Sequence, residues 1–235
     1  MSIAELAGGL ASDRLHIIVF GPGYGESVAV YVPEGGWLIC DSLSSAHGSA
    51  DLVPASELLT SRREKAAVLV LTHPHDDHVA GFDRLVQRFA DGLVGRVGIE
   101  LPEDGFTEGD DAARVLATSN RAKALAAISS HWQTHPEAKW EMSADEPPLQ
   151  LGTATVEVLH PDSGYVERGK PDPAQAPNAY STPVLICWEQ ARILLGADLP
   201  NAQWAYVLAK ARERELADHH GLKIPHHGST KWCPP

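Results

Sequence analysis

Three histidines and two carboxylates fall within six residues of this chain, from His73 to His78. They follow the apolar run Ala66–Leu71, which is typical of a buried strand, and precede a short helical pattern at Gly81–Phe89. The cluster is therefore expected on a strand-to-helix turn, where a rigid sheet can aim several side chains at one point. Imidazole nitrogens and carboxylate oxygens suit zinc, manganese, iron or nickel. Side chains this close would repel on protonation without a cation, so we favour a metal site over a solvated polar loop.

The composition bounds the class of protein. The chain has 235 residues, of which 43% are hydrophobic and 21% charged, as in a soluble globular protein. We expect one domain over residues 1–235. No run of about 18 apolar residues occurs, which predicts no transmembrane helix and no membrane partner. Because Met1–Ala7 lacks the basic start and apolar core of a signal peptide, we expect a cytoplasmic protein.

The charge restricts the partners. The formal net charge is −12, which repels polyphosphate at long range. Long nucleic acid is therefore disfavoured but not excluded, because a metal site or another subunit can supply attraction. The three cysteines are far apart and form no CxxC pair, which fits a reducing compartment.

Polar groups recur at the ends of predicted strands. The first forty residues predict an antiparallel meander that ends at Asp41, and the strand around Arg192–Leu195 is followed by Asp198. A last strand at Gly221–Pro225 delivers His226 and His227. We expect helices at 55–62, 111–133 and 199–216, and mostly loop at 91–110 and 161–177. The recurrence of a strand followed by a potential ligand indicates one converging site.

The run His73-Pro74-His75-Asp76-Asp77-His78 matches the pattern HxHxDH. With the strand ends above, it resembles the metallo-β-lactamase fold superfamily over about residues 15 to 230. The resemblance implies an α/β fold, a four-layer αββα sandwich with metals at one edge between two sheets. Members usually continue past the last ligand strand, so we expect the chain to lack a C-terminal portion, through truncation or because a partner completes the sandwich.

The resemblance assigns roles residue by residue. It implies Zn²⁺ as cofactor, in one or two ions, with Mn²⁺ or Fe as alternatives. Asp41 resembles the aspartate that orients a ligand histidine. His227, just before Gly228, is expected as the last ligand, with His226 as a substrate contact or alternate ligand. The implied metal ligands are His73 and His75 for a first metal, Asp77 and His78 for a second metal, Asp198 as the carboxylate that bridges both, and His227.

One expected ligand histidine is missing. The family usually places it after a strand like Val156–His160, but Asn178 stands at the matching position. His160 is an alternative ligand if the chain bends there. The third alternative is a first metal that is under-coordinated or absent.

Three further stretches indicate a subgroup within this superfamily. They are Gly21–Ser27, Gly196–Asp198 and Leu222–Ser229. With Asn178 and Ser181 they resemble the hydrolase domain of the bacterial competence protein ComEC and its soluble relatives. The resemblance implies phosphodiesterase or nuclease-type chemistry, and an operon partner protein. A homo-oligomer is also expected, through an exposed sheet edge near Trp232.

The implied reaction is hydrolysis by a metal-activated water, with Asp77, Asp198 and His226 as catalytic residues. A small substrate or a phosphodiester is expected. The alternatives are hydrolysis of a thioester, lactone or β-lactam, and a catalytically silent metal-binding interaction module.

Overall fold

The structure is a computed structural model that describes residues 2–21, 25–44, 52–97, 119–167, 177–209 and 219–223. The chain divides into two compact units. The first comprises Met1–Arg96 and Pro102–Trp140, and the second comprises Val97–Leu101 and Glu141–Pro235. Each unit is described by itself below, and the expected single domain stays a prediction.

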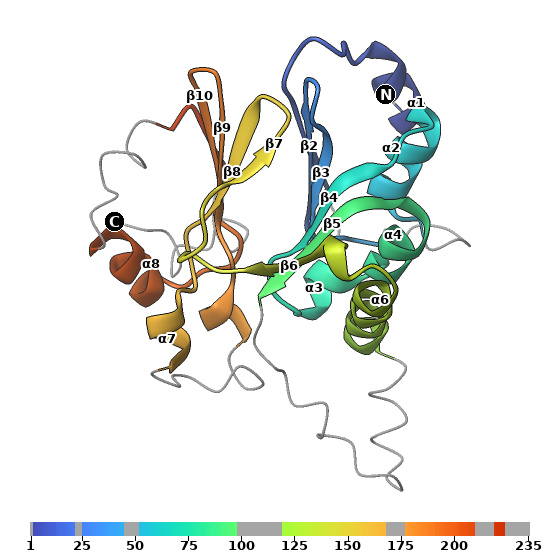
Figure 1. The fold of residues 1–235 in the computed structure, drawn as a ribbon. Coiled ribbons are helices and arrows are strands. Elements are labelled where there is room, and N and C mark those ends of the chain that lie inside the picture. Colours follow the sequence, from blue (N-terminus) through green and yellow to red (C-terminus); the bar gives the residue numbers. More distant parts are fainter. Residues whose placement is uncertain are drawn as a thin grey trace, which may run out of the picture. The chain divides into compact units, whose positions relative to one another are not determined.

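The first unit is built on a mixed sheet with the strand order β1-β2-β3-β4-β5-β6 (Figure 1). The first three strands form an antiparallel meander, while β4 is parallel to both β3 and β5. Because β3 and β4 are parallel, their C-terminal ends lie at the same edge of the sheet. Asp41, which follows β3, and the histidine cluster, which follows β4, are therefore neighbours at that edge. The strands are β1 (His16–Phe20), β2 (Ser27–Val32), β3 (Gly36–Cys40), β4 (Ala66–Leu71), β5 (Ala90–Val97) and β6 (Lys139–Met142).

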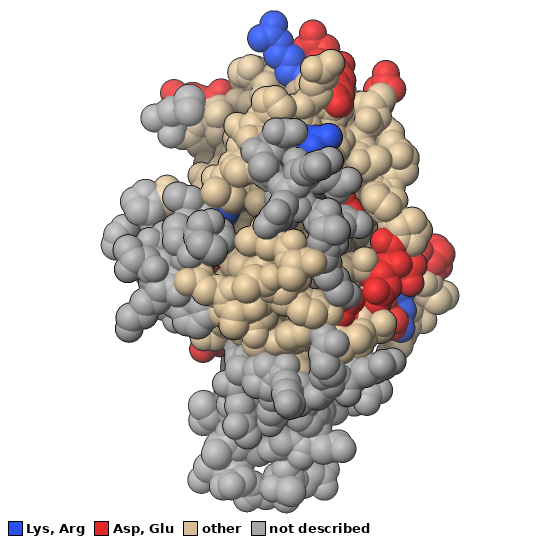
Figure 2. Space-filling view, turned by 90° about the vertical axis from the view of Figure 1, so that its left-hand side faces the viewer, with Lys and Arg blue, Asp and Glu red and all other residues tan. Residues whose placement is uncertain are grey.

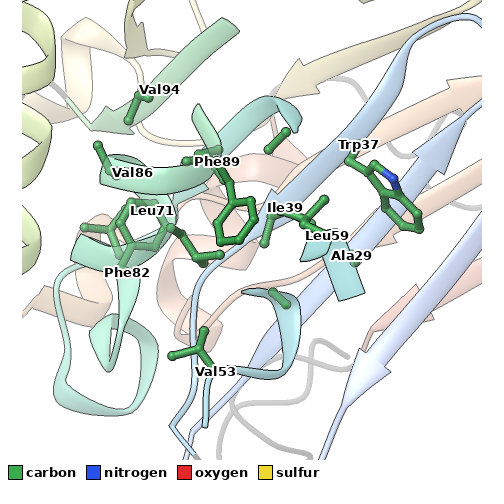
Figure 3. Close-up of a cluster of buried hydrophobic side chains, with 14 of the residues drawn as sticks. Ala29, Trp37, Ile39, Val53, Leu59, Leu71, Phe82, Val86, Phe89 and Val94 are labelled. Carbon is green, nitrogen blue, oxygen red and sulfur yellow. The ribbon is translucent and has the colours of Figure 1, made fainter. Parts of the chain in front are cut away.

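Helices cover one face of this sheet (Figure 1). They are α1 (Ile3–Gly9), α2 (Pro54–Arg62), α3 (Asp76–Val79), α4 (Phe82–Phe89) and α6 (Asn120–Thr134), followed by the 3₁₀ turn η2 (Pro136–Ala138). Their apolar sides bury a core in which Phe82 and Leu59 from helices meet Ile39 and Leu71 from strands (Figure 3). This burial fixes the strand ends that carry the candidate site, because removing apolar surface from water is the main favourable term in folding.

The second unit contains a five-stranded sheet of order β11-β10-β9-β8-β7. Among its described strand pairs, β10–β11 is parallel and the other three are antiparallel. Leu185 and Leu194 of this sheet pack against Trp204 of the helix that follows. Its elements are β7 (Leu149–Leu151), β8 (Ala154–Val158), α7 (Ser163–Glu167), η3 (Pro177–Tyr180), β9 (Val184–Trp188), β10 (Ala191–Leu195), α8 (Asn201–Val207) and β11 (Gly221–Lys223).

The expected fold class is confirmed: the chain has a mixed α/β fold with two mixed sheets and helices. The loop predicted at 91–110 is wrong in its first part, because β5 extends to Val97. A side chain at Gly92 would collide with the Ala67 backbone. This glycine therefore allows β5 to lie close to β4, and it does not form part of a loop. Within the described ranges, we find no helix with the length and hydropathy needed to cross a membrane.

The loop predicted at 161–177 is also wrong in part, because α7 occupies Ser163–Glu167. Asp162 begins this helix: its Oδ1 accepts a hydrogen bond from the Tyr165 amide at 2.6 Å. An aspartate at this position satisfies an amide that has no partner within the helix. The prolines and glycine of the segment concealed this start signal.

Helix α6 ends on a pair of histidines one turn apart. The rings of His131 and His135 lie with centroids 5.0 Å apart, and His135 Nδ1 lies 3.5 Å from Glu137 Oε1. Burial lowers the pKa of His131, and the neighbouring His135 lowers it further, while Glu137 opposes the shift. The unfolded chain therefore binds a proton at this position more readily than the folded protein does.

This difference predicts a stability that depends on pH. The contribution of neutral His131 is complete above its ordinary pKa of 6.5 and is lost as the pH falls below that value. In urea unfolding, the wild type should therefore lose more stability between neutral and mildly acidic pH than His131→Gln. The matched control is His16→Gln on β1. Parallel pH curves for wild type and His131→Gln would contradict the expectation.

Candidate metal centre

The predicted strand-to-helix turn is confirmed. β4 ends at Leu71 and α3 begins at Asp76, so the cluster spans the connection and its first turn of helix. His73 and His78 are buried, whereas 47% of the His75 side chain is exposed. The rings of His73 and His78 have centroids 4.2 Å apart, and His75 stacks on His73 at 5.9 Å. The motif therefore gathers its three imidazoles at one place.

Asp41 holds this turn from the neighbouring strand. Its Oδ1 accepts from the Thr72 amide at 2.8 Å, and its Oδ2 accepts from the Thr72 hydroxyl at 2.6 Å. Oδ2 also lies 2.8 Å from Nδ1 of His78. A buried carboxylate is costly to desolvate, and these charge-assisted hydrogen bonds offset that cost.

The backbone of Asp41 is itself unusual. Its φ of 58° lies in the left-handed region, which a non-glycine residue seldom adopts and which aspartate tolerates better than most. Three hydrogen bonds maintain the conformation: the Asp41 amide donates to Val70 O, Ser27 Oγ donates to Asp41 O, and the Ser42 amide donates to His78 O. The conformation directs the carboxylate toward the end of β4.

These contacts determine which nitrogen of each buried histidine carries the proton. Oδ2 of a carboxylate can only accept, so Nδ1 of His78 donates to Asp41 and Nε2 keeps its lone pair. The Thr72 hydroxyl has one proton and donates it to Asp41. Thr72 Oγ1 can therefore only accept from Nδ1 of His73, which lies 3.1 Å away and must carry the ring proton. Nε2 of His73 is then also a lone-pair donor. Both tautomers are those that a metal ligated through Nε2 requires.

Asp77 supplies a carboxylate beside these nitrogens. Its Oδ1 lies 3.8 Å from His78 Nε2 and 2.7 Å from His75 Nδ1. Two ligands of one zinc, each bonded at about 2.0–2.2 Å, are separated by a little over 3 Å in tetrahedral geometry. The carboxylate of Asp77 and Nε2 of His78 therefore have the chemistry, and nearly the spacing, of two ligands of one zinc-type ion.

A second set of potential ligands lies behind the histidines. Carboxylate oxygens of Glu26 and Asp41 and a nitrogen of His78 all lie within 4.8 Å of one another. Nδ1 of His78 donates its proton to Asp41 Oδ2, so this nitrogen has no lone pair to offer an ion. We interpret this set as the support that orients His78, which agrees with the role predicted for Asp41.

Glu26 and Thr72 are contributors that the sequence analysis missed. Glu26 is 7% exposed, and its amide donates to the Asp77 carbonyl at 2.9 Å, which ties the turn before β2 to the start of α3. The only sequence signal was an acidic residue after a glycine-rich turn, and a threonine after a strand. Both are ordinary features without the fold.

Asp198 lies in the second unit, at the end of β10. It is completely buried, its amide donates to Ser181 Oγ at 2.8 Å, and its Oδ1 lies 4.0 Å from Lys223 Nζ. The preceding Ala197 has a φ of 47°, again in the left-handed region. A buried carboxylate on a constrained turn suits the predicted ligand, and its convergence with the histidines of the first unit stays a prediction.

The residues near the missing ligand are also in the second unit. His160 is completely buried, its Nε2 lies 3.0 Å from the Ala179 carbonyl, and its ring meets Tyr165 edge-on at 4.4 Å. Asn178 lies on η3, where its carbonyl accepts from the Ser181 amide at 3.0 Å. Whether either residue is a ligand stays a prediction. His226 and His227 lie outside the described residues.

A family model matches most of this chain. The family model described as the metallo-beta-lactamase superfamily matches residues 21–200. The chain therefore belongs to the metallo-beta-lactamase superfamily, whose members are generally metal-dependent hydrolases. Among curated proteins, no sequence matches the chain. The narrower likeness to the ComEC hydrolase domain stays a proposal.

Several solved structures are similar to this chain. A metallo-beta-lactamase from Staphylococcus aureus subsp. aureus COL has 13% identity and a TM-score of 0.45, covering 79% of this chain and 43% of its own. The fold protein YhfI from Bacillus subtilis has 16% identity and a TM-score of 0.40, covering 78% and 62%. A metallo-beta-lactamase described as putative, from Thermotoga maritima, has 16% identity and a TM-score of 0.45, covering 87% and 90%.

Replacing Asp41 by asparagine tests whether this carboxylate orients His78. An amide NH₂ in place of Oδ2 would donate to Nδ1 of His78 and move the ring proton to Nε2, where it blocks metal binding. Asparagine also tolerates the left-handed backbone, so the fold should survive. We expect zinc affinity to fall about 10- to 100-fold in competition with a chelator. Ring ¹⁵N NMR should show the tautomer change.

The matched control is Glu34→Gln, an acid-to-amide change at an exposed turn residue with a φ of 62°. It should leave zinc affinity unchanged. Wild-type affinity in Asp41→Asn would show that this carboxylate does not orient a ligand.

Gly25 has a φ of 110° and lies against the Asp77 carbonyl. A side chain here would collide with that oxygen. Gly25→Ala should cost about 1–3 kcal/mol in urea unfolding and also weaken zinc binding by displacing Asp77. Gly8→Ala is the control, because nothing lies within 4 Å of its added atom and helical alanine should stabilise by about 0.5–1 kcal/mol. Equal stabilities for the two variants would refute the close approach.

Proposed function

We propose that this protein is a metal-dependent hydrolase that cleaves a small phosphodiester with an activated water. The observation that carries the proposal is the paired tautomer control at the cluster, in which Asp41 acts on His78 and Thr72 acts on His73. These hydrogen bonds place the ring protons on Nδ1, so the lone pairs of both histidines are on Nε2, beside a carboxylate. Packing alone does not require this choice of tautomer. This arrangement is the one that a metal centre needs.

Each residue has a defined part in this proposal. His73, Asp77 and His78 would bind the ion, with His75, Asp198 and His227 as the remaining ligands. When bound, a divalent ion lowers the pKa of a water to about 7 and polarises the phosphoryl oxygen. Asp77 and Asp198 would orient the attacking water, and one of them would take its proton. His226 would donate to the phosphoryl oxygen as charge develops there.

The substrate class rests on sequence and charge together. The resemblance to ComEC-type hydrolases favours a phosphodiester. A net charge of −12 disfavours long polyanions, and Figure 2 shows acidic patches on the described part of one face. We therefore favour a small phosphodiester over a long nucleic acid. A homo-oligomer or an operon partner protein stays a prediction.

Two alternatives follow from the same site. Hydrolysis of a thioester, lactone or β-lactam needs the same activated water, and the negative charge favours a neutral substrate. A silent metal-binding module would keep the ligands without turnover. A panel of these substrates separates the alternatives, because a module that binds zinc should hydrolyse none of them.

The direct test is metal content and hydrolysis of bis-nitrophenyl phosphate. Wild type should contain zinc or a similar ion, and Asp198→Ala should lose about 10²–10⁴-fold in turnover if it positions the nucleophile. His75→Ala should lose metal and activity together. The controls are Asp13→Ala and His135→Ala, which change exposed residues of the same types. A wild type that holds no metal, or unchanged turnover in the site variants, would overturn the proposal.

A further inference from the structure

Lys223 is a nearly buried cation beside a completely buried carboxylate, that of Asp198. The Lys223 side chain is 10% exposed. Its Nζ lies 3.2 Å from the Ala197 carbonyl and 4.0 Å from Asp198 Oδ1. An ammonium group is costly to remove from water, so a lysine at this depth needs a specific set of acceptors.

The strand pairing explains why this lysine reaches the turn. β10 and β11 are parallel, and Leu195 is opposite Lys223. The Gly196 amide donates to the Lys223 carbonyl at 3.2 Å, while the Lys223 side chain donates to the Ala197 carbonyl. Lys223 therefore contacts the turn at two points. Its backbone carbonyl binds Gly196 at the start of the turn, and its side chain binds Ala197 within the turn.

The turn between these contacts determines the direction of Asp198. Ala197 has a φ of 47°, a conformation that alanine adopts only when surrounding contacts impose it. Ser181 Oγ accepts from the Asp198 amide at 2.8 Å on the other side. Lys223 and Ser181 therefore hold Asp198 from two different segments of the second unit.

We propose that Lys223 is a positioning residue that fixes the Ala197 turn and so orients the Asp198 carboxylate for metal binding. The proposal rests on the proposed function, in which Asp198 is a ligand. The role assigned to the lysine is to hold the carboxylate through its turn, and it touches neither substrate nor metal. Ligating carboxylates are themselves held by neighbouring groups that influence metal affinity.

The test variant is Lys223→Met, which keeps the aliphatic stem and removes the donor. Two measurements apply: zinc affinity by chelator competition, and amide hydrogen exchange of a peptide spanning Leu195–Leu199 in the metal-free protein. We expect zinc affinity to fall about 10- to 100-fold. Exchange at the turn should accelerate about tenfold, because the turn opens locally more often. Lys223→Arg, which retains the charge and the donors, should recover most of the affinity.

The matched control is Lys123→Met at an exposed position on α6, which changes the charge equally and should alter neither measurement. If Lys223→Met does not fold, Lys223→Gln is the second loss variant, since its shorter side chain cannot reach the Ala197 carbonyl. Wild-type affinity and exchange in a folded loss variant would overturn the proposal, because stem packing would then be the whole role. A wild type without zinc would overturn the proposed function, whereas unchanged turn exchange in the metal-free protein separately overturns the positioning role.

Discussion

The candidate site depends on one buried carboxylate, that of Asp41. It leaves β3 in a left-handed conformation and accepts hydrogen bonds from the Thr72 amide, the Thr72 hydroxyl and His78. Each contact has a separate effect: the first positions the end of β4, the second directs the Thr72 proton away from His73, and the third sets the His78 tautomer. Without this carboxylate, no hydrogen bond would determine which ring nitrogen of the two buried histidines, His73 and His78, carries the proton.

The same principle recurs in the second unit. Asp198 follows a left-handed residue, and Ser181 and Lys223 hold it from other segments. In both units a strained strand end is stabilised by hydrogen bonds from elements distant in sequence. Strain of this kind is costly, so it persists where the surrounding structure compensates for it and often where function requires it.

The sequence predicted the local parts of this site well. The turn from His73 to His78 is short and rich in ligands, so its place between a strand and a helix followed from hydrophobic patterning alone. The role of Asp41 needed a resemblance, because a carboxylate after a strand has no distinctive local signal. Glu26, Thr72 and Lys223 were missed because their contacts join segments far apart in the chain. Gly92 misled for a related reason: a glycine that permits close strand packing has the same sequence signal as one in a turn.

The tautomers of His73 and His78 imply that their Nε2 atoms would bind a common metal. Anomalous scattering from crystals grown with zinc tests it most directly, since it identifies the ion and its ligands together. We expect an anomalous peak bonded to both Nε2 atoms and to a carboxylate oxygen, with Asp41 hydrogen-bonded to Nδ1 of His78 behind it. A peak absent from the cluster, or bonded through the Nδ1 atom that faces Asp41, would contradict it.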